Sequence, residues 1–234
     1  MSGYFITGTD TGVGKTLVTG ALMVALQQSG LVVAPMKPVA AGTIEVSGIA
    51  MNEDVALMLE LSGHRFPRHA VNPYCFAEAI APHIAARHEH VAVDMEGIRI
   101  AFATLSARAD VVLVEGAGGF LVPMSANESM ALIPSALQLP VILVVAMRLG
   151  CINHALLTVE AIRARGLKLA GWIANTPGAR MNAYVDNLTT LDTMIPAPRL
   201  GEVELLSFAT PLQAARAAAA CLSIEPLQLR KEAR

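Results

Sequence analysis

The sequence predicts an α/β fold, a parallel sheet with helices on both of its faces. Short runs rich in β-branched residues alternate with longer helical patterns along the chain, which is typical of parallel strands joined by crossover helices. Residues 111–114, Val-Val-Leu-Val, are apolar at every position, as expected for a strand buried on both faces. A glycine-rich turn at residues 8–16 joins the first expected strand to the first expected helix. Ligands of such folds bind outside the carboxyl ends of the strands.

Strands and helices are expected to alternate in chain order. The strands are expected at residues 4–7, 31–36, 111–114, 141–146, 169–174 and 198–200. The helices are expected at residues 15–29, 53–62, 94–108, 129–137, 153–165, 181–194 and 211–222. Gly30, Gly63 and Gly166 end three of these helices, because glycine readily adopts the left-handed conformation of a helix C-terminus. Asn52 is a favourable N-cap for the second helix.

One segment, residues 64–93, is much less regular than the rest. It contains Pro67, Pro73 and Pro82, and we expect a long excursion from the sheet with a short helix at most. No internal repeat and no linker divides the chain. We therefore expect one domain over residues 1–234.

The composition limits the classes of partner. Apolar residues make up 54% of the 234 residues and charged residues only 15%, which suggests that a partner covers apolar surface, most simply in a homo-oligomer. The net charge is −2 and no basic stripe is present, which argues against nucleic acid. No secretory signal and no apolar run near ~18 residues is found. Three widely spaced cysteines fit reduced thiols, so we expect a cytoplasmic protein without membrane contact.

Residues 8–16, Gly-Thr-Asp-Thr-Gly-Val-Gly-Lys-Thr, have the character of a phosphate-binding loop. Gly12 and Gly14 let backbone N–H groups turn toward an anion without a side chain in the way. The N-terminus of the following helix adds a positive partial charge. Lys15 would reach the outer phosphates, and the Thr16 hydroxyl would hold a magnesium ion.

The loop departs from the general pattern G-x-x-x-x-G-K-[ST] at its first glycine. Thr9 stands where the pattern requires glycine, and Gly8 comes one residue early. The alternative is an ordinary glycine turn between a strand and a helix. The order of strand, glycine, Lys-Thr pair and helix favours a nucleotide site.

Two carboxylates are candidates for the same magnesium ion. Glu115 follows the buried strand, where a carboxylate needs a partner to offset its desolvation. Asp54 lies in the first turn of the second helix, where capping of that helix is an equally good explanation. Magnesium usually takes one or two carboxylates with phosphate and water oxygens. Thr16, Asp54 and Glu115 would therefore be a sufficient set.

Lys37 is the only lysine between Lys15 and Lys168. Pro38 keeps its backbone extended, so the strand carries Lys37 to its carboxyl end. A solvated surface lysine is the alternative. Two ammonium groups that converge on a phosphoryl group would neutralise charge in its transfer.

Two further patterns could indicate a nucleophile or a metal site, but structural roles explain them better. Cys151 and His154 could form a thiolate–imidazole pair, but a free cysteine is more often a small buried apolar residue. The run His88-Glu89-His90 could bind a transition metal, but a solvated loop is the better explanation.

Several motifs together resemble one family, the dethiobiotin synthetases, whose fold is similar to that of P-loop NTPases. The first is the variant phosphate loop with its early Gly8. The other matching motifs are Lys37-Pro38-Val39, Val71-Asn72-Pro73-Tyr74, residues 112–119, residues 139–154, residues 170–175, residues 194–198 and Leu200-Gly201-Glu202. They follow the family's order over most of the chain.

The resemblance implies a cyclo-ligase that forms C–N bonds and converts ATP to ADP and phosphate. Its substrates would be 7,8-diaminopelargonate and CO₂ or bicarbonate, and its product dethiobiotin, in biotin biosynthesis. One amine forms a carbamate, the carbamate takes the γ-phosphoryl group, and the second amine displaces phosphate. Lys37 and Lys15 would neutralise the reacting oxygens, and Thr11 would position the diamine.

The resemblance also implies binding residues. Those for Mg-ATP are Gly12, Val13, Gly14, Lys15, Thr16, Leu17, Asp54, Glu115, Gly116, Ala117, Gly118, Asn175, Thr176, Glu204, Leu205 and Leu206, with Asn175 on the adenine. Those for the diamine substrate are Lys37, Ala41, Gly150, Cys151 and Asn153. The last three would bind the substrate carboxylate from a partner subunit at a helix start, which implies a homodimer with a shared site.

Three positions depart from the family pattern. Some relatives have a carboxylate where this chain has Gly12. Ala41 stands where the family usually has a serine. Glu204 replaces the usual proline beside the adenine.

Rival functions remain open from the loop alone. A partition-type ATPase switch would carry an extra lysine where this chain has Asp10. A small-molecule kinase would release a phosphorylated product. A GTPase would need an Asn-Lys-x-Asp motif, and a glutamine-dependent amide ligase would need a glutaminase domain.

Overall fold

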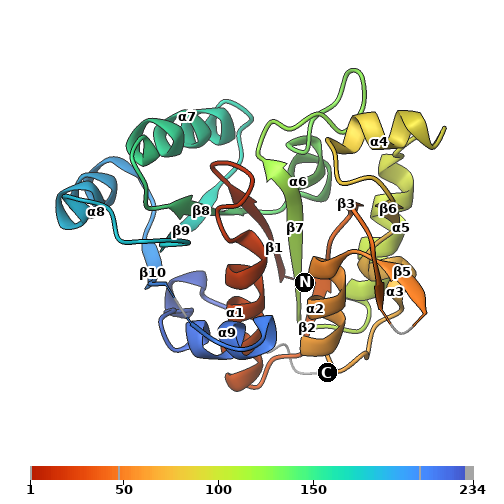
Figure 1. Ribbon diagram of the computed structural model, residues 1–234, viewed down its shortest axis with the longest axis horizontal. Helices are drawn as coiled ribbons and strands as arrows, with labels where there is room; N and C mark the ends of the chain where they lie inside the picture. The colour runs from red at the N-terminus through yellow and green to blue at the C-terminus, as the bar shows by residue number, and fades with distance from the viewer. Residues whose placement is uncertain (1, 47, 206, 230–234) are drawn as a thin grey trace.

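A six-stranded sheet forms the centre of the computed structural model, which describes residues 2–46, 48–205 and 207–229 (Figure 1). The strand order is β10-β9-β8-β1-β7-β2, and every neighbouring pair is parallel. The strands are β1 (Ser2–Gly8), β2 (Val33–Met36), β7 (Val111–Gly119), β8 (Val141–Ala146), β9 (Leu169–Asn175) and β10 (Arg199–Val203). The predicted fold class is confirmed.

Helices cover both faces of this sheet. The helices that connect its strands are α1 (Lys15–Gln28), α2 (Glu53–Leu61), α5 (Met95–Ser106), α6 (Leu132–Leu137), α7 (Cys151–Arg163) and α8 (Tyr184–Met194), and α9 (Pro211–Ala219) follows the last strand. Side chains of β1 alternate between two cores: Tyr4 and Ile6 pack with α1 and α9, whereas Phe5 packs with α5 and α6. Helices α1 and α9 lie side by side on one face (Figure 1). Successive residues of a strand point to opposite faces of the sheet, so β1 contributes apolar side chains to the layers on both faces.

Most predicted elements form, with ends that shift by a few residues. Asn52 is confirmed as the cap of α2, because its side chain accepts a bond from the Asp54 N–H at 3.1 Å. Helix α7 begins at Cys151, two residues earlier than predicted, and Gly150 precedes it with φ 92°. Glycine adopts this left-handed conformation without a steric penalty.

The expected end of the strand at residue 114 is wrong, because Glu115 and the glycines after it continue β7 as far as Gly119. A Cβ atom at Gly116 would lie 2.8 Å from Phe5 Cζ, so glycine lets the strand pass close to this ring. Gly119 pairs with Gly8 across the two strands. The residues beyond Glu115 are therefore part of the sheet.

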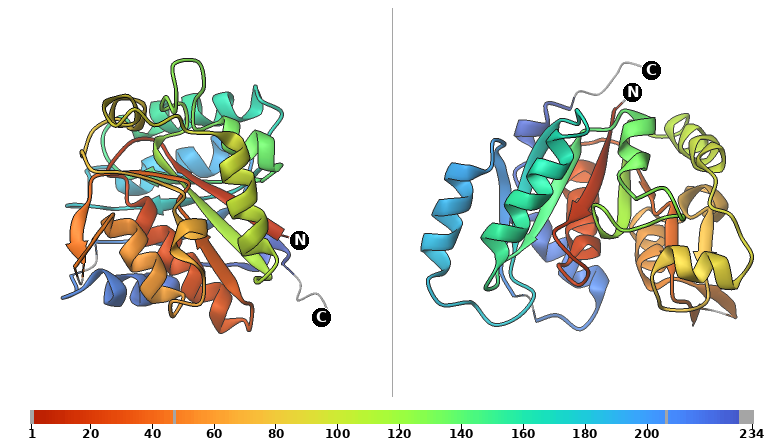
Figure 2. Two further views of the ribbon diagram at one scale, coloured as in Figure 1. Left: turned by 90° about the vertical axis from the view of Figure 1, so that its right-hand side faces the viewer. Right: turned by 90° about the horizontal axis from the view of Figure 1, so that it is seen from above.

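Residues 39–93 form a region of short elements beside the edge strand β2, shown in orange and yellow in Figure 2. They are β3 (Val39–Ala41), β4 (Ile44–Val46), β5 (Ile49–Met51), α3 (Arg68–Val71), β6 (Tyr74–Phe76) and α4 (Pro82–His88) around α2. Strand β3 pairs with β6 in parallel, and β4 pairs with β5 antiparallel. The expectation of a single short helix after residue 63 is incomplete, because strands of three residues carry almost no periodic signal.

The C-terminal part returns to the sheet. A short 3-10 helix, η1 (Glu225–Leu227), follows α9. The Tyr4 hydroxyl donates to the Leu227 carbonyl at 2.8 Å, which ties this turn to the first strand. Among the residues described, no helix is both long and apolar enough to span a membrane.

Candidate active site

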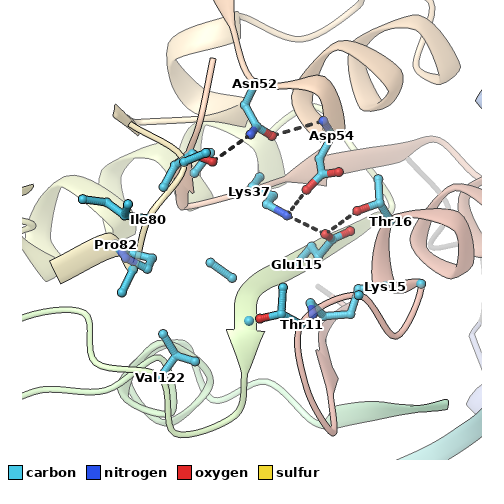
Figure 3. Close-up of a pocket in the computed structure, with 18 residues that line it drawn as sticks. Thr11, Lys15, Thr16, Lys37, Asn52, Asp54, Ile80, Pro82, Glu115 and Val122 are labelled. Atoms are coloured by element: carbon cyan, nitrogen blue, oxygen red, sulfur yellow. Dashed lines mark hydrogen bonds and ion pairs between the residues drawn. The ribbon is translucent and has the colours of Figure 1, made fainter. Parts of the chain in front are cut away.

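Three neighbouring parallel strands, β1, β7 and β2, lead to one cavity of about 770 Å³ (Figure 3). Strand β1 leads to the phosphate loop, β2 to Lys37, β7 to Glu115, and β9 to Asn175 beside the loop. The residues that line the cavity are Thr11, Gly12, Gly14, Lys15, Thr16, Lys37, Ala40, Ala41, Asn52, Asp54, Ala79, Ile80, Ala81, Pro82, Glu115, Ala117, Gly118 and Val122. The three candidate catalytic residues, Thr11, Lys15 and Lys37, are all in this set.

The phosphate loop has its shape fixed by backbone conformation. Gly12 and Gly14 have φ values of 72° and 89°, which side chains rarely adopt. The Asn175 Nδ2 group donates to the Val13 carbonyl at 2.7 Å, and a Cβ atom at Gly14 would lie 2.1 Å from that nitrogen. Gly14 also precedes α1 directly, so the unpaired N–H groups of the first helical turn face the loop. The loop can hold an anion with backbone groups alone.

Lys37 lies between two carboxylates. Its Nζ atom donates to Asp54 Oδ2 and, at 2.6 Å, to Glu115 Oε1 (Figure 3). The side chain of Glu115 is fully buried and that of Lys37 is 6% exposed, whereas Asp54 is 33% exposed. The Thr16 hydroxyl donates to the same Glu115 Oε1 at 2.9 Å. Four polar side chains, from α1, α2, β7 and the residue after β2, therefore form one group around Lys37 and Glu115.

The charges of this group shift the pKa values of its members. Burial acts to lower the pKa of Lys37, but the charges of Glu115 and Asp54 outweigh it, and the pKa lies above its ordinary value. Burial acts to raise the pKa of Asp54, but the charge and hydrogen bond of Lys37 outweigh it, and the pKa lies below its ordinary value. Both groups are charged at neutral pH.

Lys15 is the second buried ammonium group in the cavity. Its Nζ atom donates to the Asp10 carbonyl at 3.0 Å. Burial lowers the pKa of Lys15 below its ordinary value; the Glu115 carboxylate opposes this shift and the Lys37 charge adds to it. A cation that is only partly compensated in a buried cavity favours an anionic ligand.

The oxygen atoms at this edge suit magnesium. Glu115 Oε2 is buried without a hydrogen-bond partner among the described residues, and Thr16 Oγ1 and Asp54 lie beside it. Within the same residues, no cluster of three or more His, Cys, Asp or Glu side chains could hold a metal ion. Two carboxylates and a hydroxyl that leave room for phosphate and water oxygens fit Mg²⁺ better than a thiolate- or histidine-bound metal. Because Asn52 caps α2, the Asp54 carboxylate is left for Lys37 and such an ion.

Asn175, the last residue of β9, and Thr176 after it are 1% and 4% exposed. Asn175 Oδ1 and Thr176 Oγ1 are buried, and neither has a partner in the described part of the chain. Both are free to bind a polar group of a base. Glu204 is exposed and forms an ion pair with Arg180 at 3.4 Å.

Several predicted binding residues lie outside the cavity lining. They are Val13, Leu17, Gly116, Asn175, Thr176, Glu204, Leu205, Gly150, Cys151 and Asn153. Leu206 lies outside the described residues. Cys151 is buried, which raises the pKa of its thiol, and this fits a packing role. His88 is exposed and contacts Glu78 at 3.0 Å, as expected for a surface loop.

Sequence reasoning missed one wall of the cavity. Ile80, Pro82 and Val122 lie opposite Asp54 (Figure 3). The first two belong to the irregular segment, where no periodic pattern marks a binding residue. Asn52 was recognised only as a helix cap, but its Nδ2 group also donates to the Gly42 carbonyl at 2.8 Å and ties the chain after β3 to the start of α2.

Comparisons with known proteins agree with this geometry. A family model described as an AAA domain matches residues 2–212. The chain is 50% identical over 212 residues to the ATP-dependent dethiobiotin synthetase BioD of Aromatoleum aromaticum, covering 91% of this chain and 94% of that protein. It is 45% identical to the protein of the same name from Ralstonia nicotianae over 226 residues, or 97% of each. Among solved structures, the MinC:MinD cell division complex of Aquifex aeolicus has a chain with TM-score 0.60, 15% identity, and coverage of 100% of this chain and 99% of that one. At this identity the likeness shows the fold alone.

Proposed function

The chain belongs to the ATP-dependent dethiobiotin synthetase family, and from this premise we propose how its own residues carry out the reaction. The chain is an ATP-dependent cyclo-ligase that forms the ureido ring of dethiobiotin in biotin biosynthesis. The observation that carries this conclusion is the alignment with relatives of that name over more than nine tenths of both chains.

The substrates are 7,8-diaminopelargonate and CO₂, as the family name implies. One amine adds to CO₂ to form a carbamate, and a carbamate oxygen displaces ADP from the γ-phosphorus of ATP. The second amine then attacks the carbonyl carbon of the mixed anhydride, and phosphate leaves as the ring closes. Lys15 and Lys37 neutralise the carbamate and phosphate oxygens, since charge neutralisation and positioning are the main needs of phosphoryl transfer. Thr11, which lines the same cavity, positions the diamine.

Thr16, Asp54 and Glu115 hold a magnesium ion in this proposal. The unpartnered Glu115 Oε2 supports it, because a buried carboxylate oxygen is costly without a partner. A bound ion would supply positive charge against the phosphate oxygens of ATP.

The remaining nucleotide contacts involve backbone N–H groups for the phosphates and side chains for the adenine. The N–H groups of residues 12–17 face the phosphates, and residues 115–118 of β7 lie along the other side of the cavity. Asn175 and Thr176 bind the adenine through their buried oxygens, with Glu204 and Leu205 at its outer edge. The ion pair of Glu204 with Arg180 leaves its carboxylate away from the cavity lining.

The diamine lies beside Lys37 and Ala41, along the apolar wall of Ile80, Pro82 and Val122. Its carboxylate extends to Gly150, Cys151 and Asn153 of a second copy of the chain.

Two observations support this homodimer. Residues 150–153 do not line the chain's own cavity, and Leu149 beside them is 93% exposed. Leu121 and Leu157, about half exposed, line a groove of about 440 Å³ along α7 next to the phosphate loop. A second copy would cover this apolar surface. The mass in solution, measured by light scattering, tests the dimer; a monomer at micromolar concentration would contradict it.

We also propose that residues 1–234 act as one synthetase domain in the cytoplasm. The described elements all build on the central sheet or its edge, and biotin precursors and ATP are intracellular metabolites.

The decisive experiment supplies purified protein with 7,8-diaminopelargonate, bicarbonate and Mg-ATP. We expect dethiobiotin, ADP and phosphate in equal amounts. Steady ATP hydrolysis that needs another protein and gives no dethiobiotin would favour a partition-type switch. A phosphorylated product that accumulates would favour a small-molecule kinase.

The role of Lys37 is tested by Lys37→Gln, with Lys168→Gln as the matched control. Lys168 is exposed and remote from the cavity lining. We expect turnover of Lys37→Gln to fall by at least about 100-fold, with unchanged turnover in the control. Full activity of Lys37→Gln would refute its catalytic role.

A further inference from the structure

Lys37 occupies the centre of the oxygen set assigned to magnesium. Its ammonium group contacts Asp54 Oδ2 and Glu115 Oε1, and Thr16 donates to the same Glu115 oxygen (Figure 3). These three residues are the proposed metal ligands. The ammonium group and a magnesium ion would therefore share the same two carboxylates, of which Lys37 contacts one oxygen each, while Glu115 Oε2 has no partner among the described residues.

The two cations cannot both contact these oxygens at full strength. Glu115 is fully buried and Lys37 is nearly so, and like charges repel strongly where water does not screen them. A cation that binds to both carboxylates therefore weakens the contacts of the Lys37 ammonium with them and favours its release from at least one. Asp54, one third exposed, is the more accessible of the two.

A displaced ammonium group needs a new partner. A buried charge that loses its counter-ions is strongly destabilised, and the walls around Lys37 beyond the two carboxylates include the apolar side chains of Ala40 and Ala41. Phosphate or carbamate oxygens in the cavity would supply the missing negative charge. Release of Lys37 is therefore favourable only when a cation reaches the carboxylates and an anion reaches the lysine.

We propose that Lys37 is a built-in competitor of magnesium, so that binding of the metal–nucleotide pair and release of Lys37 toward the reacting oxygens form one coupled event. The proposal rests on the proposed function, because that function assigns the metal ligands. In this arrangement Asp54 and Glu115 bind a divalent cation weakly by themselves. The same lysine that serves the reaction also keeps the empty metal ligands neutralised.

The test measures divalent cation binding to nucleotide-free protein, without turnover. Mn²⁺ is the probe, because it accepts similar oxygen ligands and is detected by electron paramagnetic resonance. The variants are Lys37→Met, which removes the competing charge, and Lys37→Arg, which keeps it. Lys168→Met is the control for loss of an exposed lysine. All are titrated at pH 8 after thermal unfolding has shown that they fold.

We expect Lys37→Met to bind one Mn²⁺ at least about tenfold more tightly than the wild type, because one adjacent positive charge is gone. Lys37→Arg and Lys168→Met should remain as weak as the wild type. Addition of ADP should raise the Mn²⁺ affinity of the wild type more than that of Lys37→Met. Affinities of Lys37→Met and wild type within twofold of each other would overturn the proposal, and Lys37→Gln replaces Lys37→Met if the latter does not fold.

Failure of the proposed function has a different signature. A wild-type protein that forms no dethiobiotin would overturn that function. The comparison of Mn²⁺ affinities uses neither the diamine nor the product, so its outcome is independent of that assay.

Discussion

The two walls of the cavity are held by different forces. The phosphate loop and Asn175 form one wall, where left-handed glycines and a hydrogen bond between Asn175 and the Val13 carbonyl determine the shape. The opposite wall carries Lys37 and Asp54, whose positions depend on paired charges. We call the first the steric wall, because steric contacts determine its shape. We call the second the electrostatic wall, because ion pairs determine the positions of its side chains.

The difference indicates which wall of the site keeps its shape and which wall rearranges when an ion binds. A loop built from backbone groups keeps its shape whether or not a charge is bound. A buried cluster of opposite charges rearranges when another ion enters it. Substitutions on the two walls should therefore differ in kind as well as in size.

The largest effect is expected from Gly14→Ala on the steric wall. The new Cβ atom would meet Asn175 Nδ2 at 2.1 Å in a backbone with φ 89°. Relief of that clash breaks the bond of Asn175 to Val13, and we expect Mg-ADP affinity to fall about 100-fold, or about 3 kcal/mol. Calorimetric titration measures it.

Gly30→Ala is the matched control for that substitution. Gly30 has φ 86° but an added Cβ atom meets nothing within 4 Å, so it carries the backbone strain without the clash. Its Mg-ADP affinity should equal that of the wild type. Equal losses in the two variants would show that strain alone, and not the contact with Asn175, determines the loop.

The next effect concerns Asn175→Ala. It removes the donor to the Val13 carbonyl at 2.7 Å in a buried position, and we expect the free energy of unfolding to fall by about 1–3 kcal/mol. Chemical denaturation measures it. Asn187→Ala removes a bond to the Ala183 carbonyl near the surface and should cost less than about 1 kcal/mol. A loss of unfolding free energy in Asn187→Ala larger than that in Asn175→Ala would contradict the idea that burial makes the Asn175 hydrogen bond important for stability.

Acid should weaken the electrostatic wall. Because the folded pKa of Asp54 lies below its ordinary value, its contribution to stability is complete above pH ~4 and is lost as the pH falls through the folded pKa. Asp54→Asn should therefore lose less stability than the wild type between pH 5 and pH 2, roughly the range of carboxyl titration. Thermal unfolding at each pH measures this. Asp186→Asn, at an exposed position of α8, should follow the wild type; parallel curves for all three proteins would refute the role of Asp54.

The smallest effect is expected from Asp10→Asn, a charge change on the steric wall. Asp10 pairs with Arg148 at 2.8 Å, with both side chains about half exposed. Exposed ion pairs contribute roughly 0–1 kcal/mol, so stability and Mg-ADP affinity should hardly change. Denaturation at low and high salt measures this. A loss above about 2 kcal/mol would mean that the loop depends on charge after all.

The sequence alone determined the central fold and the phosphate loop of the steric wall. Apolar runs predict the strands at 4–7, 111–114 and 141–146. The glycines and the Lys-Thr pair predict the loop at 8–16. These signals are local, because propensity, periodicity and the conformational freedom of glycine act within a few residues. Lys37 could be placed at the end of its strand for the same reason.

Only the tertiary structure decided how the electrostatic wall is assembled. Lys37 and Glu115 are 78 residues apart in the sequence, and no local pattern shows that they share a hydrogen bond or that Asp54 completes the group. The short strands of residues 39–76 and the apolar wall at Ile80 and Pro82 were invisible for the same reason. Their conformation depends on long-range packing and charge pairing, which are properties of the folded chain and not of any segment of it.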